Sequence, residues 1–552
     1  MKQVLMVIGG TSHPFEPCAT IFKEAMEGGG QFSITVTQDR ASLADLSGFD
    51  AVVMYTVRGE MSEAQEQGLV HFVRAGGGLL AIHCANAGMS KFEAYTEMVG
   101  SEFTHHGPVA AFDVEITEDA GDLFPRLSSK FAVMDEFYSI ERRTDAPLRE
   151  FLHGTWQFRK VLLGYVRDYG AGKVLYTALG HDERTFRHPD FQDLLFKGLR
   201  YVTGLKEQTP IRIGLLGYGP AYQMGKHHSE QIAATQGFEL TAVCDRDPAR
   251  LEAAKEEQGE RIATFTDAEE MAASGVIDLG VVILPHAYHA SGIKTFLNAG
   301  LHVITEKPFA VTAAECDEAI ALAKEKGVML SVYHNRHWDS DVLTLRKIVE
   351  AGTIGEIYSL ECNMVGYGRP GPAWRSHKPI SGGVLYDMGA HQFEKIFQLL
   401  PKSDTEGNPI NRRASLYGHF LKKMWHDTTA EDYARAYARF DGGVEAQVVV
   451  SSICSASKPL WIVSGTRGSV VIPSWQDNAV LTTVDDSGHR FTTEVPQIEG
   501  VWGSYYKNVA DHLLAGAPLI ITPEWAKAPI QCIEGCEIAA RENRIVEVAF
   551  DF

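Results

Sequence analysis

The sequence feature that most constrains the fold is an apolar strand that ends in a glycine turn near the middle of the chain. Residues 211–216 form this strand, and Gly217 and Gly219 follow it. The position of the usual third glycine is taken by Tyr222, and Gly225 stands three residues later. Glycines are needed in such a turn because the backbone bends tightly there and approaches a ligand closely. The pattern predicts a Rossmann-type fold with a three-residue insertion in the turn.

The next strand of this pattern ends in an acidic residue. The strand is expected at 240–244, and Asp245 follows it, 20 residues after Gly225. A carboxylate there can accept hydrogen bonds from both hydroxyls of an adenosine ribose, while a pyrophosphate sits on the amides of the helix N-terminus. The residues therefore favour NAD over NADP, although Arg246 leaves room for a 2′-phosphate. The alternative is a glycine turn and a surface aspartate in a domain that binds no nucleotide.

A separate α/β pattern precedes this turn. Strands are expected at 4–8, 51–55, 79–83 and 174–179, and helices at 63–74 and 190–202. Such alternation indicates a parallel sheet with helices on its faces. The polar residues that follow resemble a linker. We therefore expect an α/β domain at 1–205, a linker at 206–210 and a Rossmann domain at 211–332.

The remaining residues, 333–552, follow a different pattern. A helix is expected at 340–351, and strands follow in succession at 433–440, 444–451, 461–464 and 470–472. A last helix is expected at 523–543 and a closing strand at 546–550. Consecutive strands without helices between them indicate an antiparallel sheet. This part is therefore expected to be an α+β domain with an open, mainly antiparallel sheet.

Composition narrows the range of partners. Lys and Arg number 51 against 71 Asp and Glu, and this charge of −20 argues against nucleic acids and anionic membranes. No apolar stretch approaches the length of a membrane span, and the first strand leads into Gly-Gly-Thr-Ser-His without a cleavage site. Eight cysteines without a CxxC pair suit a reducing compartment. We expect a cytoplasmic protein with a small-molecule partner.

Residues able to carry out chemistry follow two further strands of the Rossmann pattern. Both loops fall at the carboxyl ends of parallel strands, where such folds bind ligands. They contain Pro285, His286 and His289 in the first loop, and Glu306, Lys307 and Pro308 in the second. Beyond a double glycine at 382–383, Asp387 and His391 stand four residues apart. They share one face if this stretch is helical.

At these motifs the sequence resembles the glucose–fructose oxidoreductase/inositol dehydrogenase family (Gfo/Idh/MocA). The resemblance covers about residues 211–550 and rests on the glycine turn, the Glu-Lys-Pro motif and the motif Asp387-x-Gly389-x-His391. It implies a nicotinamide-dependent oxidoreductase whose second domain forms homo-oligomer contacts through its open sheet. It also implies that Lys307, Asp387 and His391 are the catalytic residues. The expected cofactor contacts are Gly217, Gly219, Gly225, Asp245, Arg246, Pro285, His286, His289, Glu306 and Lys307.

Oxidation of a secondary alcohol suits these three residue types. A neutral imidazole, that of His391, can take the hydroxyl proton near neutral pH. Lys307 would stabilise the developing alkoxide, and Asp387 would orient the pair and tune its pKa values. The Lys307–Pro308 bond is a candidate for the cis form. Taken singly, the three residues could instead be a surface lysine, a helix cap and a packed histidine.

Aromatic and long polar side chains near these motifs suit a sugar, although a solvated loop would look similar. The candidates for substrate contact are Asn335, Arg336, Trp374, Arg375 and Lys378. Our leading hypothesis is NAD-dependent oxidation of a secondary hydroxyl of a sugar or glycoside, with C3 as the candidate carbon. One alternative is a redox-neutral, NAD-dependent glycosidase or lyase that acts through a transient 3-keto intermediate. Another is a non-catalytic sugar-binding scaffold.

Residues 1–205 resemble a ThuA-like domain, which belongs to a family related to trehalose utilisation. The resemblance implies a flavodoxin-type fold like that of class I glutamine amidotransferases. It rests on Gly9–His13, Gly76–His83, Phe103-x-x-His106, Asp135–Tyr138 and Gly180–Asp182. Amidotransferases place a nucleophilic cysteine at the centre of the turn after a strand. Here His83 takes that position and Cys84 is one residue off, so glutamine hydrolysis is not expected.

Polar side chains after the strands of this domain could converge in one pocket. Imidazoles and carboxylates could bind a divalent metal there or provide acid–base groups for a carbohydrate. The alternative is a set of hydrogen-bonded histidines in a degenerate pocket. We expect the domain to act on or bind the same carbohydrate as the oxidoreductase part. The candidates are His13, His83, His106, Asp135, Glu136, Tyr138, His181 and Asp182.

Overall fold

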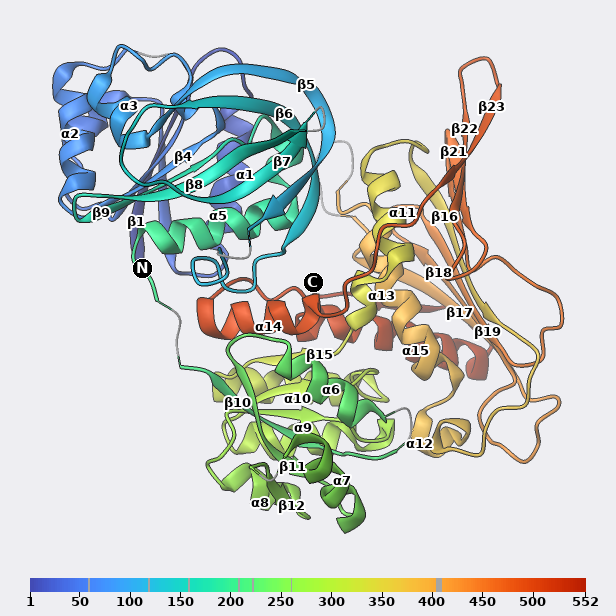
Figure 1. Cartoon of the computed structure of the whole chain (residues 1–552). Coiled ribbons are helices and arrows are strands. Elements are labelled where there is room, and N and C mark those ends of the chain that lie inside the picture. Colours follow the sequence, from blue (N-terminus) through green and yellow to red (C-terminus); the bar gives the residue numbers. More distant parts are fainter. Residues whose placement is uncertain are drawn as a thin grey trace. The chain divides into compact units, whose positions relative to one another are not determined.

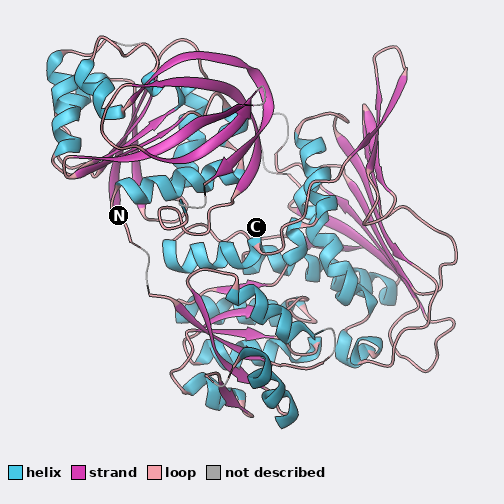
Figure 2. Cartoon of the chain, in the orientation of Figure 1, coloured by secondary structure: helices cyan, strands magenta, loops and turns pink. Residues whose placement is uncertain are grey.

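The computed structural model describes residues 1–57, 60–117, 120–156, 159–206, 209–220, 223–259, 261–403 and 410–552. Tyr222 of the glycine turn, and Glu207 and Gln208 of the expected linker, lie outside these residues. The chain divides into two compact units (Figures 1 and 2). The first unit combines Met1–Thr209 with Ala510–Pro518, and the second combines Pro210–Val509 with Leu519–Phe552.

The first unit is built on a nine-stranded sheet of order β2-β1-β3-β4-β9-β8-β7-β5-β6. Its first five strands are parallel to one another. They are β1 (Lys2–Gly9), β2 (Phe32–Thr37), β3 (Ala51–Thr56), β4 (Gly78–Ile82) and β9 (Gly172–Thr177). β3 and β4 are buried along their whole length, as expected for parallel strands that are covered on both faces. This strand order is that of a flavodoxin-type sheet, so the expected fold of this part is confirmed.

The other four strands of this sheet differ from the alternating pattern expected from the sequence. They pair antiparallel and follow α3 (Glu93–Val99), and the described residues between them form no helix as long as α3. They are β5 (Ser101–Ile116), β6 (Lys130–Arg142), β7 (Arg149–Trp156) and β8 (Arg159–Tyr169). Much of β6 alternates between buried and exposed residues, which is typical of a half-covered antiparallel strand. No strand is expected from the sequence between residues 83 and 174, so these four antiparallel strands are an addition to the expected parallel sheet.

Two expected helices of this unit are confirmed as α2 (Glu63–Arg74) and α5 (Pro189–Val202). α2 begins at a capping box, in which Gln65 N donates to Ser62 Oγ and Ser62 N donates to Gln65 Oε1. The N-terminal helix α1 (Phe15–Glu27) and α5 both bury an apolar face. Each of these helices therefore covers the apolar strands of the sheet through one side.

A segment from late in the sequence belongs to the first unit. It is the C-terminal part of α14 (Ser504–Ala515) and the residues that follow. Arg126 Nε donates to Asp511 Oδ1 at 2.8 Å and Lys197 Nζ to Asp511 Oδ2 at 3.2 Å, and all three side chains are buried. Ala515 is part of the apolar core, and its carbonyl accepts a hydrogen bond from Arg200 Nη1 at 2.8 Å.

The second unit begins with a six-stranded parallel sheet of order β12-β11-β10-β13-β14-β15. Its strands are β10 (Ile211–Leu216), β11 (Phe238–Cys244), β12 (Ala263–Phe265), β13 (Leu279–Val282), β14 (His302–Thr305) and β15 (Leu330–Val332). The connecting helices are α6 (Met224–Ala233), α7 (Pro248–Gln258), α8 (Ala268–Ala273), α9 (His289–Asn298) and α10 (Ala313–Lys326). This order is the Rossmann order, so that expectation is confirmed. It reverses beside β10, where such sheets bind their ligands.

The second sheet of this unit has nine strands in the order β23-β22-β21-β20-β16-β19-β18-β17-β24. Every neighbouring pair is antiparallel except β16 (Ile357–Val365) with β19 (Glu445–Ser451). The expected open, mainly antiparallel sheet is therefore confirmed. The other strands are β17 (Arg413–Leu421), β18 (Tyr433–Phe440), β20 (Trp461–Gly465), β21 (Gly468–Ile472), β22 (Ala479–Val484), β23 (Arg490–Val495) and β24 (Val546–Ala549).

Helix α15 (Pro523–Glu542) packs on one face of this sheet, against β17 and α13 (Ala390–Leu399). A Cβ atom at Gly418 of β17 would lie 2.2 Å from the carbonyl oxygen of Cys536, so the helix can approach this closely only because glycine stands there. α11 (Ser340–Glu350) also packs against α13. Among the described residues, no helix combines the length and apolar character that a membrane span requires.

The buried charge group around Asp511 gives a first testable prediction. Replacing Asp511 with Ala removes this carboxylate from the buried cations Arg126 and Lys197, of which Lys197 keeps its ion pair with Asp193 at 2.8 Å. We expect a loss of about 3 kcal/mol in the free energy of unfolding, mainly from Arg126. The matched control is Asp113→Ala, which breaks an exposed ion pair with Lys130 on the same sheet. Thermal unfolding should show a lower midpoint for Asp511→Ala and little change for the control. Equal midpoints for the two variants would contradict the assignment.

Candidate active site

The glycine turn after β10 is shaped by close packing on one side and open space on the other. Gly217 has a φ of +106°, and a Cβ atom there would lie 2.4 Å from the carbonyl oxygen of Ile283. In α6, a Cβ atom at Gly225 would lie 2.6 Å from the ring of Tyr218. Apart from Gly219 itself and its two chain neighbours, no described residue has an atom within 4 Å of a Cβ atom built on Gly219. The backbone at Gly219 can therefore be approached by a ligand.

A cleft of about 620 Å³ runs along the carboxyl ends of the parallel strands of the second unit. One part of its wall is the glycine turn with Asp245 and Arg246, and another part is formed by Lys307, Trp374 and Arg375. The volume is within the range of cofactor and small-molecule sites. The cleft lies at the reversal of strand order, which is the expected position of a dinucleotide.

Asp245 is fixed at the edge of this cleft by backbone amides. Tyr218 N donates to Asp245 Oδ2 at 2.7 Å, and Asp247 N donates to Oδ1 at 3.0 Å. Each carboxylate oxygen retains a second lone pair that can accept a further hydrogen bond. The acidic group that the sequence predicted for ribose binding therefore has a defined orientation beside Arg246.

Lys307 and Asp387 form an ion pair near the cleft. Lys307 Nζ donates to Asp387 Oδ1 and to the Asp387 carbonyl oxygen, both at 2.8 Å, and Arg375 Nε donates to Oδ1 at 3.3 Å. Burial opposes ionisation of Asp387, but Lys307 and Arg375 outweigh it and hold the carboxyl pKa well below its usual value. Asp387 is therefore ionised at neutral pH. The Lys307–Pro308 peptide bond is cis.

His391 lies in α13, directly after a π-helical turn, Leu385–Gly389, that contains Asp387. Its ring is buried, and Nδ1 has no hydrogen-bond partner in the described part of the chain. Burial, followed by the charges of Lys307 and Arg336, lowers the pKa of His391 well below 6.5. The imidazole is therefore neutral at pH 7 and able to accept a proton. Because the charge of Lys307 contributes to lowering the pKa of His391, these two predicted catalytic residues lie in the same region of the second unit.

His334 was not among the residues singled out in the sequence. It follows β15, so it stands at the carboxyl end of a parallel strand, and this position was the available signal. Both of its ring nitrogens are buried without a hydrogen-bond partner in the described residues. The ring centroids of His334 and His391 are 6.1 Å apart. Burial lowers the pKa of His334 to about 4, so this imidazole is also neutral at pH 7.

The predicted substrate contacts differ in their surroundings. Trp374 and Arg375 line the cleft, and Arg336 acts electrostatically on His391. Asn335 is buried and is not part of the cleft wall described above. Lys378 Nζ donates to Glu431 Oε1 at 2.6 Å and to Glu537 Oε1 at 2.7 Å, so its ammonium is held by two carboxylates of the protein.

The loop after β13 contributes to the cleft through Pro285 and His286. His286 Nδ1 lies 2.7 Å from the carbonyl oxygen of Ser381, and its ring packs edge-on against Trp374. His289 is buried with its two nitrogens 2.7 Å from the carbonyl oxygens of Pro308 and Leu284, which connects this loop to the Lys307 loop. The last predicted cofactor contact, Glu306, lines the cleft and accepts a hydrogen bond from the amide of Lys307.

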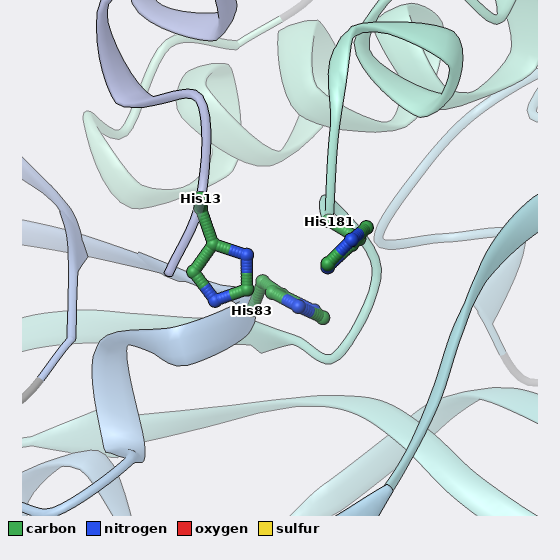
Figure 3. Close-up of side chains that lie close together, drawn as sticks. All are labelled: His13, His83 and His181. Carbon is green, nitrogen blue, oxygen red and sulfur yellow. The ribbon is translucent and has the colours of Figure 1, made fainter. Parts of the chain in front are cut away.

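In the first unit, three of the predicted histidines lie together. His13, His83 and His181 each offer one ring nitrogen, and these atoms lie within 4.8 Å of one another (Figure 3). Tyr138 stacks on His83 with ring centroids 3.8 Å apart. Glu136 Oε2 lies 3.1 Å from His181 Nδ1.

The other predicted residues of this pocket have different surroundings. His106 Nδ1 lies 3.3 Å from Glu136 Oε1, and its side chain is about half exposed. Asp135 is fully buried and accepts hydrogen bonds from three backbone amides, and burial raises its carboxyl pKa. Asp182 caps α4 (Glu183–Phe186) and pairs with Arg184, so its carboxylate serves the helix N-terminus.

Three family models match the chain in succession. A model described as "Trehalose utilisation" (ThuA) matches residues 3–202. A model described as "Oxidoreductase family, NAD-binding Rossmann fold" matches residues 211–334. The "GFO/IDH/MocA C-terminal domain" matches residues 342–471.

Curated relatives match the oxidoreductase part. The scyllo-inositol 2-dehydrogenase (NADP(+)) IolW of Bacillus subtilis is 27% identical over 381 residues, which cover 62% of this chain and 98% of that protein. The uncharacterized oxidoreductase YdgJ of Escherichia coli is 31% identical over 265 residues, which cover 47% of this chain and 70% of that protein. The solved structure of an NAD-binding protein from Listeria innocua is 25% identical, with a TM-score of 0.54 over 62% of this chain and 97% of that one.

The unpartnered ring of His334 gives a second testable prediction. Its pKa is 6.5 in the unfolded chain and about 4 in the folded one, so between these pH values the unfolded state binds more protons. Stability contributed by the neutral ring is therefore present above pH 6.5 and is lost as the pH falls toward 4. The full loss amounts to about 3 kcal/mol.

We expect His334→Gln, which cannot titrate, to make the unfolding midpoint fall less steeply over this pH window than in the parent protein. The exposed His105→Gln is the control and should leave the slope unchanged. Calorimetric scans across the window provide the measurement. An unchanged slope in His334→Gln would show that this ring is already protonated in the folded protein.

Proposed function

The chain belongs to the Gfo/Idh/MocA family of oxidoreductases and carries a ThuA domain before its Rossmann fold, and from this we propose that it oxidises a secondary hydroxyl of a sugar or glycoside with NAD. The observation that carries the proposal is the Lys307–Asp387 ion pair, whose lysine lines the nucleotide cleft and acts electrostatically on the neutral His391. The name of the inositol dehydrogenase from Bacillus subtilis supports a polyol substrate.

The residues of the cleft fit a nicotinamide dinucleotide. The open backbone at Gly219 can receive a pyrophosphate, and the Asp245 carboxylate can accept hydrogen bonds from ribose hydroxyls. A bound nicotinamide would supply the hydride acceptor. The remaining requirements are to remove the hydroxyl proton and to stabilise charge on the oxygen, and both are met by side chains of this chain.

In the proposed mechanism, His391 accepts the proton of the substrate hydroxyl. Its low pKa makes the unprotonated form available at neutral pH, although the same low pKa limits its strength as a base. The Lys307 ammonium compensates, because a hydrogen bond to the substrate oxygen stabilises the developing negative charge. Asp387 holds Lys307 by two 2.8 Å contacts, one from its carboxylate and one from its carbonyl, and so directs the ammonium.

Substrate recognition is proposed to use groups around these three residues. His334 has two nitrogens without hydrogen-bond partners in the described residues, and each can bind a hydroxyl group. Trp374 offers an apolar surface to a sugar ring, and Arg375 offers donors. We place oxidation at C3 of a glycoside because ThuA-like domains are associated with 3-keto sugar metabolism. The fused ThuA domain would bind or process the same carbohydrate. A separate proposal concerns assembly: exposed side chains of the open sheet, such as Tyr358 and Tyr417, would form contacts in a homo-oligomer.

The test of the reaction is incubation of the full chain with NAD and a panel of polyols and glycosides, followed by NADH absorbance. We expect Lys307→Met to lower kcat/KM by about 100-fold or more, because the alkoxide loses its cationic partner. Lys294→Met, on the exposed surface of α9, is the matched control and should retain activity. Full activity in Lys307→Met would refute the mechanism. Release of an aglycone without NADH accumulation would instead identify the redox-neutral glycosidase.

The choice of cofactor has its own test at Asp245. A 2′-phosphate would meet the fixed carboxylate, so we propose NAD for this chain, in contrast to the NADP(+) named for its relative from Bacillus subtilis. Asp245→Ser should lower kcat/KM with NAD and raise it with NADP, where Arg246 can pair with the phosphate. Asp247→Ser, two residues away at the cap of α7, is the control. A parent enzyme that prefers NADP would contradict the proposal.

A further inference from the structure

The three histidines of the first unit are brought together by parallel strands. His13 follows β1, His83 begins the turn directly after β4, and His181 follows β9. β1 and β4 both pair with β3, and β9 pairs with β4, all in parallel, so the three carboxyl ends meet at one edge of the sheet. Figure 3 shows the three rings at one place, where one nitrogen of each lies within 4.8 Å of the others.

His83 has the orientation and the tautomer of a metal ligand. Its Nδ1 lies 2.6 Å from the carbonyl oxygen of Ala178, which can only accept, so Nδ1 carries the hydrogen and Nε2 presents a lone pair. This Nε2 is buried and has no hydrogen-bond partner among the described residues. Histidines that bind metals commonly donate their second N–H to a backbone carbonyl in this way. A φ of +49° and the stacked ring of Tyr138 fix the direction of the side chain.

The other two rings also present nitrogens toward this place. His13 Nδ1 is buried and has no hydrogen-bond partner in the described part of the chain. The ring of His13 lies 4.9 Å from that of His83 and 5.0 Å from that of His181, measured between centroids. Buried polar atoms without partners are rare in native proteins because each one loses its hydrogen bonds to water. Several such nitrogens at one point therefore indicate that something else binds there.

Glu136 supplies negative charge beside these rings. Its Oε2 lies 3.1 Å from His181 Nδ1 and 3.6 Å from His83 Nε2. In the neutral form of His83, the Nε2 lone pair and the Glu136 carboxylate repel each other, and either a proton on the ring or a metal cation between them removes this repulsion. Asp135 stabilises this arrangement, because its carboxylate accepts the amides of Glu136, Gly180 and His181.

We propose that His13, His83 and His181 bind one divalent transition-metal ion of the zinc class, with the Glu136 carboxylate beside it. Imidazole nitrogens favour zinc and other transition metals such as copper, iron and nickel, whereas magnesium and calcium prefer oxygen ligands. Zinc–nitrogen bonds of about 2.0–2.1 Å place tetrahedral ligand atoms about 3.3 Å apart. The nitrogens lie within 4.8 Å of one another, so binding would require the side chains to rotate until their nitrogens are closer together.

Three protein ligands leave one tetrahedral position open, which is the arrangement of catalytic rather than structural zinc sites. The open position would take an oxygen ligand, either water or a hydroxyl or carbonyl group of a polyol. A metal ion lowers the pKa of such a ligand, and Glu136 is close enough to the cluster to accept its proton. The residues of this second site all belong to the first unit, whereas the residues that line the nicotinamide cleft belong to the second unit.

The test uses the full, untagged chain after treatment with a chelator and dialysis. Calorimetric titration with Zn²⁺ and elemental analysis should give one ion bound per chain. We expect His83→Gln and His181→Gln to lower the affinity by more than 100-fold, and Glu136→Gln, which changes a group beside the ion, to lower it by about 10- to 100-fold. His105→Gln, an exposed histidine on the same sheet, is the matched control and should bind like the parent.

Two readouts keep this proposal separate from folding and from the oxidoreductase reaction. NADH binding by each variant reports on the second unit, and a thermal unfolding transition like that of the parent shows that the variant chain is folded. Co²⁺ bound in place of zinc should give the visible absorption bands of a tetrahedral site, and His83→Gln should abolish them. The proposal is refuted if the parent protein binds no Zn²⁺, or if folded His83→Gln and the parent bind it equally. The latter result would mean an adventitious ion only.

Discussion

Both units depend on the same constraint, which is that parallel strands bring the loops after them to one edge of a sheet. In the first unit this edge gathers His13, His83 and His181, and in the second it gathers the glycine turn, Asp245 and Lys307. Strands such as β3 and β4 are buried along their whole length, and burial on both faces requires mostly apolar residues. The polar residues of both sites stand where the strands end. The same geometry therefore supports a nucleotide cleft in one unit and a histidine cluster in the other.

The carboxylates near the two sheet edges, Asp387 and Glu136, are balanced by different kinds of groups. In the oxidoreductase unit the buried carboxylate of Asp387 is balanced by Lys307 and Arg375, and the histidines nearby are held neutral by burial. Neutral imidazoles beside a fixed ammonium suit proton removal from an alcohol. In the ThuA unit, the Glu136 carboxylate lies beside the rings of His83, His106 and His181, and among the described residues no lysine or arginine forms an ion pair with it. A bound cation fits that imbalance.

The sequence was sufficient for elements with strong local patterns. Helix α2 and strand β18 have the bounds expected from periodicity, and the Rossmann order followed from the glycine turn. The antiparallel strands β5–β8 were missed because charged residues alternate along them and hide the apolar face. The sequence predicts functional roles for Lys307, Asp387 and Arg375. It does not predict that Lys307 and Arg375 both bind the Asp387 carboxylate, because the Lys307 loop is far from Asp387 in the sequence. His334 was overlooked since a histidine after an apolar strand resembles core packing, and only its unsatisfied nitrogens distinguish it.

The segment Ala510–Pro518 has a consequence for how this protein can be divided. The polypeptide contributes to the first unit twice, before and after most of the second. A shortened protein that stops at Thr209 would lack Asp511 and the core residue Ala515, leaving Arg126, Lys197 and Arg200 with fewer partners. A single break after Thr209 would therefore separate Ala510–Pro518 from the other residues of the first unit. The first unit is therefore built from two separate stretches of the polypeptide rather than from one continuous stretch.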